Sequence, residues 1–255
     1  MTAEERVALV TGGATGIGRA TCVELARRGI RNIHIGYSRS ADAAESLVAE
    51  LAELGATGHP LRIDVSDRDA VGQAATQLLA TSGGLDILVN SAGVTKKIDF
   101  TDLDAITPEL WDEILGTNLL GAFWVCQAFA ETLKERGGSI VNVSSISATR
   151  VVGSSLPYSV SKAALSQLTR ALAVALAPTV RVNAVVPGTV LSGWHERLVG
   201  TEAAQAGFEA EARLVPMGRL ADAADIGEAI ATLALGMGFA TGQEIIVDGG
   251  KALRY

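Results

Sequence analysis

Two residues that could transfer a proton stand one helical turn apart in the segment LPYSVSK, namely Tyr158 and Lys162. Residues four apart on a helix share a face, so the two side chains can meet. Free tyrosine has a pKa near 10, and a neighbouring cation favours the phenolate. Lowering that pKa to about 7 corresponds to roughly 4 kcal/mol and would make the phenol an acid or base near neutral pH. Because any helix can carry such a pair for packing alone, the interpretation depends on the surrounding residues.

Two serines end the apolar run GSIVNVSS, thirteen and fourteen residues before the tyrosine. The run predicts a buried strand, which places Ser144 and Ser145 at an edge of the sheet. A hydroxyl group there can donate a hydrogen bond to a reacting oxygen as negative charge develops on it.

A glycine-rich stretch, TGGATGIGRA, directly follows the first apolar run of the chain. Gly12, Gly16 and Gly18 do not have the G-x-G-x-x-G spacing, but they stand at a predicted strand-to-helix turn. Glycines there permit positive φ and let a pyrophosphate approach the helix N-terminus closely. A glycine-rich turn without a ligand is the alternative interpretation.

The elements that must position these residues alternate along the chain between β-branched apolar runs and longer segments of helical period. The predicted strands are 7–11, 32–36, 60–65, 86–92, 138–145, 180–187 and 243–250, and the predicted helices are 16–29, 41–55, 67–82, 108–136, 158–177 and 222–235. Thr107 before Pro108 predicts one helix start, and Ser66 with Asp69 predicts another. The alternation predicts an α/β protein, a doubly wound Rossmann fold in which helices flank a seven-stranded parallel sheet.

Composition limits the class of protein. At 255 residues with 48% hydrophobic and 19% charged residues, the chain suits one domain, 1–255. The net charge of −7 argues against nucleic acid as a partner, and no apolar run is long enough for a membrane span. The N-terminus carries glutamates in place of the cations of a signal peptide, so we expect a cytoplasmic protein. The histidines and cysteines show no ligand spacing, and we predict no metal site.

Four motifs taken together resemble the short-chain dehydrogenase/reductase family. They are TGGATGIG, NSAG at 90–93, YSVSK at 158–162 and PG at 187–188, and the resemblance extends from Val7 to Gly250. It implies hydride transfer between a nicotinamide cofactor and a carbonyl or alcohol, with Asn118, Ser145, Tyr158 and Lys162 as the catalytic residues. By the family's spacing Ser145 is the donor and Ser144 its neighbour, Asn118 holds a water in a relay from the lysine, and Lys162 also binds the nicotinamide ribose.

The same resemblance implies which residues bind the cofactor. Besides Tyr158 and Lys162, they are Gly12, Thr15, Gly16, Ile17 and Gly18 in the first loop, Asp64 and Val65 beside the adenine, Asn90, Ala92 and Gly93 at the floor of the site, and Pro187, Gly188, Val190 and Ser192 near the nicotinamide.

The residues after the second strand, GYSRSAD, bear on the choice between NADP(H) and NAD(H). An acidic residue at that strand end would bind a ribose 2′-hydroxyl group, but Gly36 and Tyr37 stand there. Arg39 and Ser40 follow and could bind a 2′-phosphate, unless Arg39 is an ordinary surface arginine. Relatives that prefer NADPH often have a cation where this chain has Thr15. We predict a preference for NADP(H), with NAD(H) as the alternative.

The substrate is less well defined. The chain looks most like 3-oxoacyl-(acyl-carrier-protein) reductases, which implies an acyl-thioester or small carbonyl substrate and an acyl carrier protein as a candidate partner. Lys96, Lys97 and Arg136 could attract such an acidic partner, although residues 177–179 lack the arginine common in those relatives. The alternatives are a polyol, sugar, steroid or small-alcohol dehydrogenase, a cofactor-binding regulator or scaffold, and a glycine-loop protein without nicotinamide.

Two further expectations concern the periphery of the site. Residues 192–217 lie where relatives have a mobile substrate lid. Trp194, His195, Leu198 and Phe208 could line the pocket beneath it or could pack the helices of the lid itself. The helix stretch 119–129 leaves almost no polar face, so we expect a second subunit to cover it. Together with the family resemblance, this predicts a homotetramer.

Overall fold

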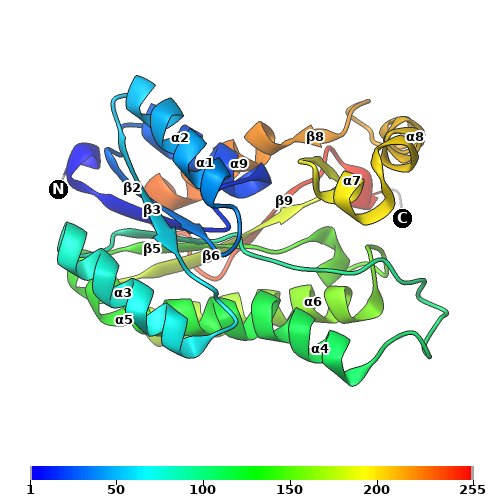
Figure 1. Cartoon of the computed structure of the whole chain (residues 1–255), viewed down its shortest axis with the longest axis horizontal. Helices are drawn as coiled ribbons and strands as arrows, with labels where there is room; N and C mark the ends of the chain where they lie inside the picture. Colours follow the sequence, from blue (N-terminus) through cyan, green and yellow to red (C-terminus); the bar gives the residue numbers. More distant parts are fainter. Residues whose placement is uncertain (1, 254–255) are drawn as a thin grey trace.

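A parallel β-sheet forms the centre of the computed structural model, which describes residues 2–253 apart from the side chains of Glu4 and His195 (Figure 1). Its strands are β1 (Val7–Thr11), β2 (Asn32–Tyr37), β3 (Thr57–Arg62), β4 (Ile87–Asn90), β5 (Ser139–Val143), β6 (Arg181–Pro187) and β9 (Glu244–Val247). Their order is β3-β2-β1-β4-β5-β6-β9, and all neighbours run parallel. The predicted seven-stranded doubly wound sheet is confirmed.

Helices cover both faces of the sheet (Figure 1). One layer holds α1 (Gly16–Arg27), α2 (Ala41–Glu53) and α9 (Ala223–Leu235); the other holds α3 (Arg68–Ser82), α4 (Pro108–Leu115), α5 (Ala122–Arg136) and α6 (Leu156–Leu176). Alternate residues of a strand pack against opposite helix layers. In β1, Ala8 and Val10 belong to the apolar cluster of α1 and α9, whereas Val7 and Leu9 pack with α3 and α5. The strands are therefore buried on both faces, as their continuous apolar sequences predict.

Among the predicted boundaries that differ from the structure, those of α3 and β3 have a clear local cause. Asp67, and not Ser66, caps α3, and its Oδ1 accepts hydrogen bonds from the backbone N–H groups of Asp69 and Ala70 at 2.9 and 3.2 Å. Strand β3 begins three residues before the predicted start and contains Pro60. Proline lacks a backbone N–H, but β3 lies at the edge of the sheet and, within residues 2–253, pairs with β2 alone, so this loss is tolerated.

The predicted helix 108–136 is interrupted by a π-helical turn. Thr107 caps α4, and its Oγ1 accepts from the N–H of Leu110 at 3.3 Å. The turn, Gly116–Gly121, separates α4 from α5. On the stretch expected to be covered on two sides, Val125 and Phe129 are fully buried against the sheet, but Leu120 is 44% exposed on this single chain. The outer face is thus available for the expected second subunit.

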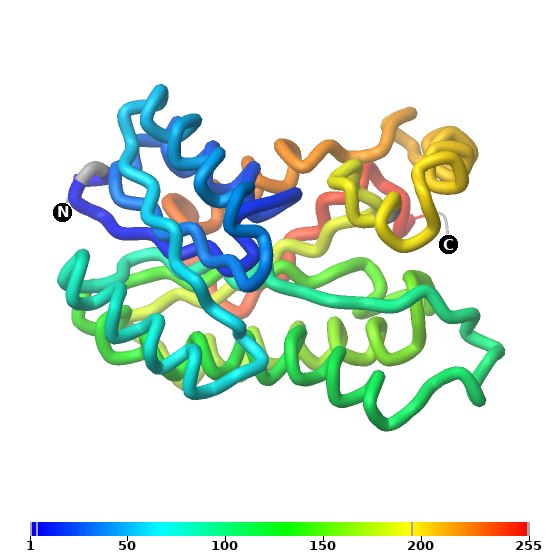
Figure 2. Tube along the Cα trace, in the orientation of Figure 1, coloured from blue at the N-terminus to red at the C-terminus, as the bar shows by residue number. Residues whose placement is uncertain are grey.

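The segment between β6 and α9 forms a separate layer beside the cavity, beyond the carboxyl ends of the strands. It contains β7 (Val190–Leu191), α7 (Trp194–Val199), α8 (Thr201–Ala212) and β8 (Ala221–Asp222), and β7 pairs with β8. Figure 2 shows this layer, in yellow and orange, beside the red C-terminal segment. Within residues 2–253, no helix has the length and apolar character to cross a membrane.

Candidate active site

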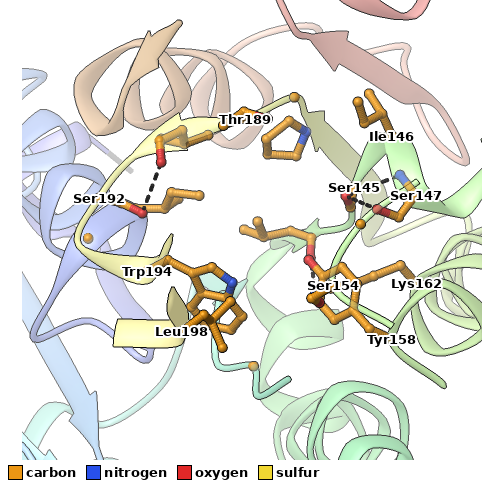
Figure 3. Close-up of a pocket in the computed structure, with 18 of the residues that line it drawn as sticks. Ser145, Ile146, Ser147, Ser154, Tyr158, Lys162, Thr189, Ser192, Trp194 and Leu198 are labelled. Atoms are coloured by element: carbon orange, nitrogen blue, oxygen red, sulfur yellow. Dashed lines mark hydrogen bonds between the residues drawn. The ribbon is translucent and has the colours of Figure 1, made fainter. Parts of the chain in front are cut away.

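A cavity of about 490 Å³ lies beyond the carboxyl ends of the central strands (Figure 3). Its wall is formed by the glycine loop after β1, the residues after β4 and β5, the first turns of α6 and the chain after β6. The strand order reverses between β1 and β4, and doubly wound sheets bind ligands at such a point.

The glycine loop is shaped so that side chains are excluded. Gly12 has φ +63°, and a Cβ atom on it would lie 3.0 Å from the Cα of Ala92. A Cβ atom on Gly18 would lie 2.2 Å from the carbonyl oxygen of Gly12, which is a severe clash. Backbone N–H groups can therefore approach a ligand phosphate at the start of α1, as dinucleotide binding requires.

Ser145 lies just after β5 at the cavity wall. Its backbone is extended, and its side chain caps the short 3₁₀ helix Ile146–Ala148 by accepting from the N–H of Ser147 at 3.2 Å. The Ser145 hydroxyl also donates to the Ser147 hydroxyl at 3.1 Å (Figure 3). Ser144 also lines the cavity, but its Oγ is bonded to α6, to the Ser166 hydroxyl and to the carbonyl of Lys162.

Tyr158 and Lys162 lie on the same face of α6, as their spacing predicts. The Lys162 Nζ donates to the Val143 carbonyl at 2.8 Å and lies 5.7 Å from the centroid of the Tyr158 ring. Burial raises the pKa of Tyr158 to about 12, against the opposite effect of a hydrogen bond with Ser145, and burial lowers the pKa of Lys162 to about 8. The direction is opposite to the expected lowering by the lysine, because desolvation of the phenol outweighs its hydrogen bond with Ser145. At neutral pH the phenol stays protonated and can donate its proton.

Asn118 lies in the π-helical turn and is 1% exposed. Its Oδ1 accepts from the N–H of Val94 at 2.8 Å, and its Nδ2 donates to the Val94 carbonyl and to the Ser161 hydroxyl, both at 3.0 Å. Ser161 in turn donates to the Tyr158 carbonyl at 2.7 Å. Sequence reasoning missed Ser161, although it directly precedes the lysine in YSVSK.

Most of the predicted site residues meet at the cavity. Those that line it are Gly12, Thr15, Gly16, Ile17, Gly18, Ala92, Gly93, Ser145, Tyr158, Lys162, Pro187, Gly188, Val190 and Ser192. Asn118 lies behind this wall, where its Oδ1 is 3.4 Å from the position of a Cβ atom on Gly93. Thr11, which sequence reasoning missed, fixes the residues after β4 by accepting from the N–H groups of Ser91 and Ala92.

The remaining predicted residues lie away from the cavity wall. Asn90 is buried within the sheet, and its Nδ2 donates to Asn142 Oδ1 at 2.9 Å. Arg39 and Ser40 are exposed after β2. Asp64 accepts from the backbone and hydroxyl of Ser66 in its own turn. Val65 is packed so closely on the π-helical turn that a Cβ atom on Gly121 would lie 2.8 Å from its Cγ2.

Two of the four expected lid residues line the cavity. Trp194 and Leu198 line the cavity across from Tyr158, with the Trp194 ring 3.9 Å from the Cβ position of Gly93 (Figure 3). Phe208 on α8 is outside the cavity wall in the described part of the chain, and the His195 side chain lies outside the described residues.

Comparison with known proteins identifies the family. A family model described as enoyl-(acyl carrier protein) reductase matches residues 12–252. A protein named as a ketoacyl reductase of the granaticin polyketide synthase of Streptomyces violaceoruber is 38% identical over 98% of this chain and 97% of its own. The chain belongs to the short-chain dehydrogenase/reductase family. It is accordingly an oxidoreductase of the class that uses NAD(P).

Two further relatives act on sugars or sugar acids according to their names. L-Rhamnose 1-dehydrogenase (NAD(P)(+)) of Azotobacter vinelandii is 36% identical over 96% of each chain. A gluconate 5-dehydrogenase from Burkholderia cenocepacia, solved with NADP and tartrate, is 30% identical, covers 98% of this chain and 96% of its own, and superposes with a TM-score of 0.88. The relatives thus include both ketoacyl reductases and sugar dehydrogenases.

Proposed function

We propose that this short-chain dehydrogenase/reductase reduces a carbonyl to a secondary alcohol, or the reverse, with Ser145, Tyr158 and Lys162 at the reacting oxygen. One observation carries the proposal: all three side chains line the same cavity as the glycine loop. When bound there, the nicotinamide cofactor supplies or accepts the hydride.

Residues of this chain bind the carbonyl oxygen of the substrate and transfer a proton to it. The Ser145 hydroxyl donates a hydrogen bond to the carbonyl oxygen and stabilises the charge that develops on it. The neutral Tyr158 phenol then transfers its proton to that oxygen, and burial favours this neutral form by raising the tyrosine pKa to about 12. Lys162 stabilises the resulting phenolate as a nearby cation. Asn118 holds the Val94 backbone and α6 in register and is the proposed holder of a relay water.

Substitution at the tyrosine and at the serines tests this assignment. Tyr158→Phe should keep a normal melting temperature and cofactor-induced thermal shift but lose turnover by roughly 10²–10⁴-fold. Ser145→Ala should lose about 10²–10³-fold. The matched control is Ser144→Ala, which removes a hydroxyl whose bonds within the described residues go to Lys162 and Ser166 on α6, and it should retain most activity. Substantial turnover by Tyr158→Phe, or equal losses in the two serine variants, would contradict the proposal.

For the cofactor we propose a preference for NADP(H) that depends on Arg39 and Ser40. Both residues are exposed after β2 and can reach a 2′-phosphate there. The 2′-phosphate would pair with the Arg39 guanidinium, and Asp64 with Val65 would flank the adenine. Arg39→Ala should lower the ratio of NADPH to NADH affinity about tenfold in a thermal-shift titration, whereas Arg27→Ala, an exposed arginine on α1, should not. An unchanged ratio in Arg39→Ala would refute this preference.

On the resemblance to 3-oxoacyl-(acyl-carrier-protein) reductases, we propose an acyl-thioester substrate and an acyl carrier protein as partner. The structure makes Arg136 an unsuitable contact for such an acidic partner. Arg136 pairs with Asp86 at 3.2 Å, just before β4 begins, which is the end of the sheet opposite the cavity. Lys97 does line the cavity. A sugar substrate is the second candidate, and the hydroxyl groups of Ser147, Ser154 and Thr189 in the cavity wall favour it.

A further inference from the structure

A charged pair lies in the cavity wall, on segments of the chain other than those that carry the reacting residues. Lys251, just after β9, and Glu211, at the end of α8, both line the cavity wall and form an ion pair. Their side chains are only 14% and 26% exposed. The Lys251 Nζ also donates to the Thr189 hydroxyl at 3.0 Å, and Thr189 lines the same wall.

The backbone around Lys251 fixes it in this place. Asp248 accepts from the N–H groups of Gly250 and Ala252 at 2.8 and 2.6 Å, which closes a tight turn around the lysine. The N–H of Met217 donates to the Gly249 carbonyl at 3.2 Å and joins this turn to the segment after α8. The same proximity of the yellow-orange layer and the red C-terminal segment can be followed in Figure 2. Backbone hydrogen bonds therefore hold the ion pair in a fixed place in the cavity wall.

A largely buried ion pair is not explained by stability alone. Removing two charges from water costs more than the pair often returns, and well-packed apolar residues would serve as well or better. A cavity that holds an aliphatic acyl chain would desolvate this pair further and offer it no new hydrogen bond. A ligand with hydroxyl groups avoids this cost, because each hydroxyl can both donate to the carboxylate and accept from the ammonium.

The chemistry of the wall suits such a ligand. The Lys251 ammonium has three N–H donors, and within the described residues Thr189 and Glu211 receive two of them. Ser147, beside Ser145, and Ser154, beside Tyr158, add hydroxyl groups to the cavity wall (Figure 3). Trp194 supplies a flat apolar surface against which the C–H faces of a sugar can pack.

We propose that the substrate is a hydroxyl-rich carbonyl compound of the sugar class and that Lys251, Glu211 and Thr189 bind its hydroxyl groups. This inference rests on the proposed carbonyl–alcohol chemistry and names its substrate class. Lys251 and Glu211 are then specificity-determining residues that act away from the hydride transfer. Lys97 and Arg197 also line the cavity, but both are exposed and screened by solvent, so they select less strongly for a negative charge.

The first experiment compares substrate classes with the purified wild-type enzyme. Oxidation of NADPH and NADH is followed with D-xylulose, 5-keto-D-gluconate, acetoacetyl-CoA and the small diketone 2,3-butanedione. At least one sugar probe should have a kcat/KM tenfold or more above that of acetoacetyl-CoA; preference for 5-keto-D-gluconate over D-xylulose adds a role for the exposed cations. A higher kcat/KM for acetoacetyl-CoA overturns the inference but leaves the proposed function intact. Absence of turnover with all four compounds overturns the proposed function itself.

The second experiment tests the pair directly. Lys251→Met and Glu211→Gln should each lower the ratio of kcat/KM for the sugar to that for 2,3-butanedione at least tenfold, mainly by raising KM for the sugar. The double variant should lose little more than either single one, since the two residues act together. Lys134→Met on α5, where the side chain is half-buried, and Glu209→Gln at an exposed position of α8 make the same changes outside the cavity wall and should leave the ratio within twofold.

Circular dichroism and the NADPH-induced thermal shift establish that each variant folds. If Lys251→Met does not fold, Glu211→Gln alone decides, because it preserves the size of the side chain. Ratios that stay within twofold of wild type in the folded variants overturn the inference.

Discussion

Ser161 connects two of the proposed catalytic residues, and its removal should affect stability and turnover together. Its hydroxyl accepts from Asn118 Nδ2 at 3.0 Å and donates to the Tyr158 carbonyl at 2.7 Å. Both Ser161 and Asn118 are buried, at 0% and 1% exposure, so water cannot replace the missing partner. Ser161→Ala therefore leaves one buried N–H of Asn118 unsatisfied.

An unsatisfied buried donor costs about 1–3 kcal/mol, and in a chain of this size each kcal/mol lowers the melting temperature by roughly 2–4 °C. We expect Ser161→Ala to melt about 2–12 °C lower than wild type. We also expect kcat to fall at least tenfold, which corresponds to about 1.4 kcal/mol in the barrier, because Asn118 no longer holds a single orientation.

The control is Ser159→Ala on the same helix. Its hydroxyl donates to the Val152 carbonyl at 2.9 Å and has no bond to Asn118. Differential scanning calorimetry and steady-state kinetics on both variants separate the two effects. If Ser161→Ala and Ser159→Ala have the same melting temperature and the same kcat, the argument from Asn118 is wrong.

Two other predictions follow from the loop and from a buried histidine. Gly18→Ala should abolish the dinucleotide-induced thermal shift, because its Cβ would lie 2.2 Å from the Gly12 carbonyl oxygen. Gly72→Ala in α3 has open space around its Cβ position and should instead raise the free energy of unfolding by about 0.5–1 kcal/mol. Burial lowers the pKa of His34 from 6.5 to about 4, so the folded state binds fewer protons than the unfolded state between these values, and stability should fall as the pH falls. Denaturant unfolding at pH 7 and pH 5 should show a loss on the order of 1 kcal/mol that is smaller in His34→Gln; an equal loss in both proteins would exclude His34 as the cause.

Much of the fold followed from local sequence patterns. Continuous apolar runs separated by helical periods predict a two-sided parallel sheet, and Thr107 with Pro108 predicts a helix start that the structure confirms. The boundaries that differed depend on neighbours. Pro60 argues against a strand from 57 until the strand's edge position is known. The π-helical turn at Gly116–Gly121 packs closely on Val65, which is distant in the sequence.

The sequence by itself determined the chemistry that is available: a glycine loop after the first strand, a serine at a strand end, and a tyrosine and a lysine with helical spacing. Those signals are local, because each needs only its own strand or helix. Tertiary structure decided the rest. It reversed the expected shift of the tyrosine pKa, since desolvation depends on everything packed around the ring. It also brought Lys251 and Glu211, forty residues apart in the sequence, into one cavity wall with Thr189, which no spacing rule could have predicted.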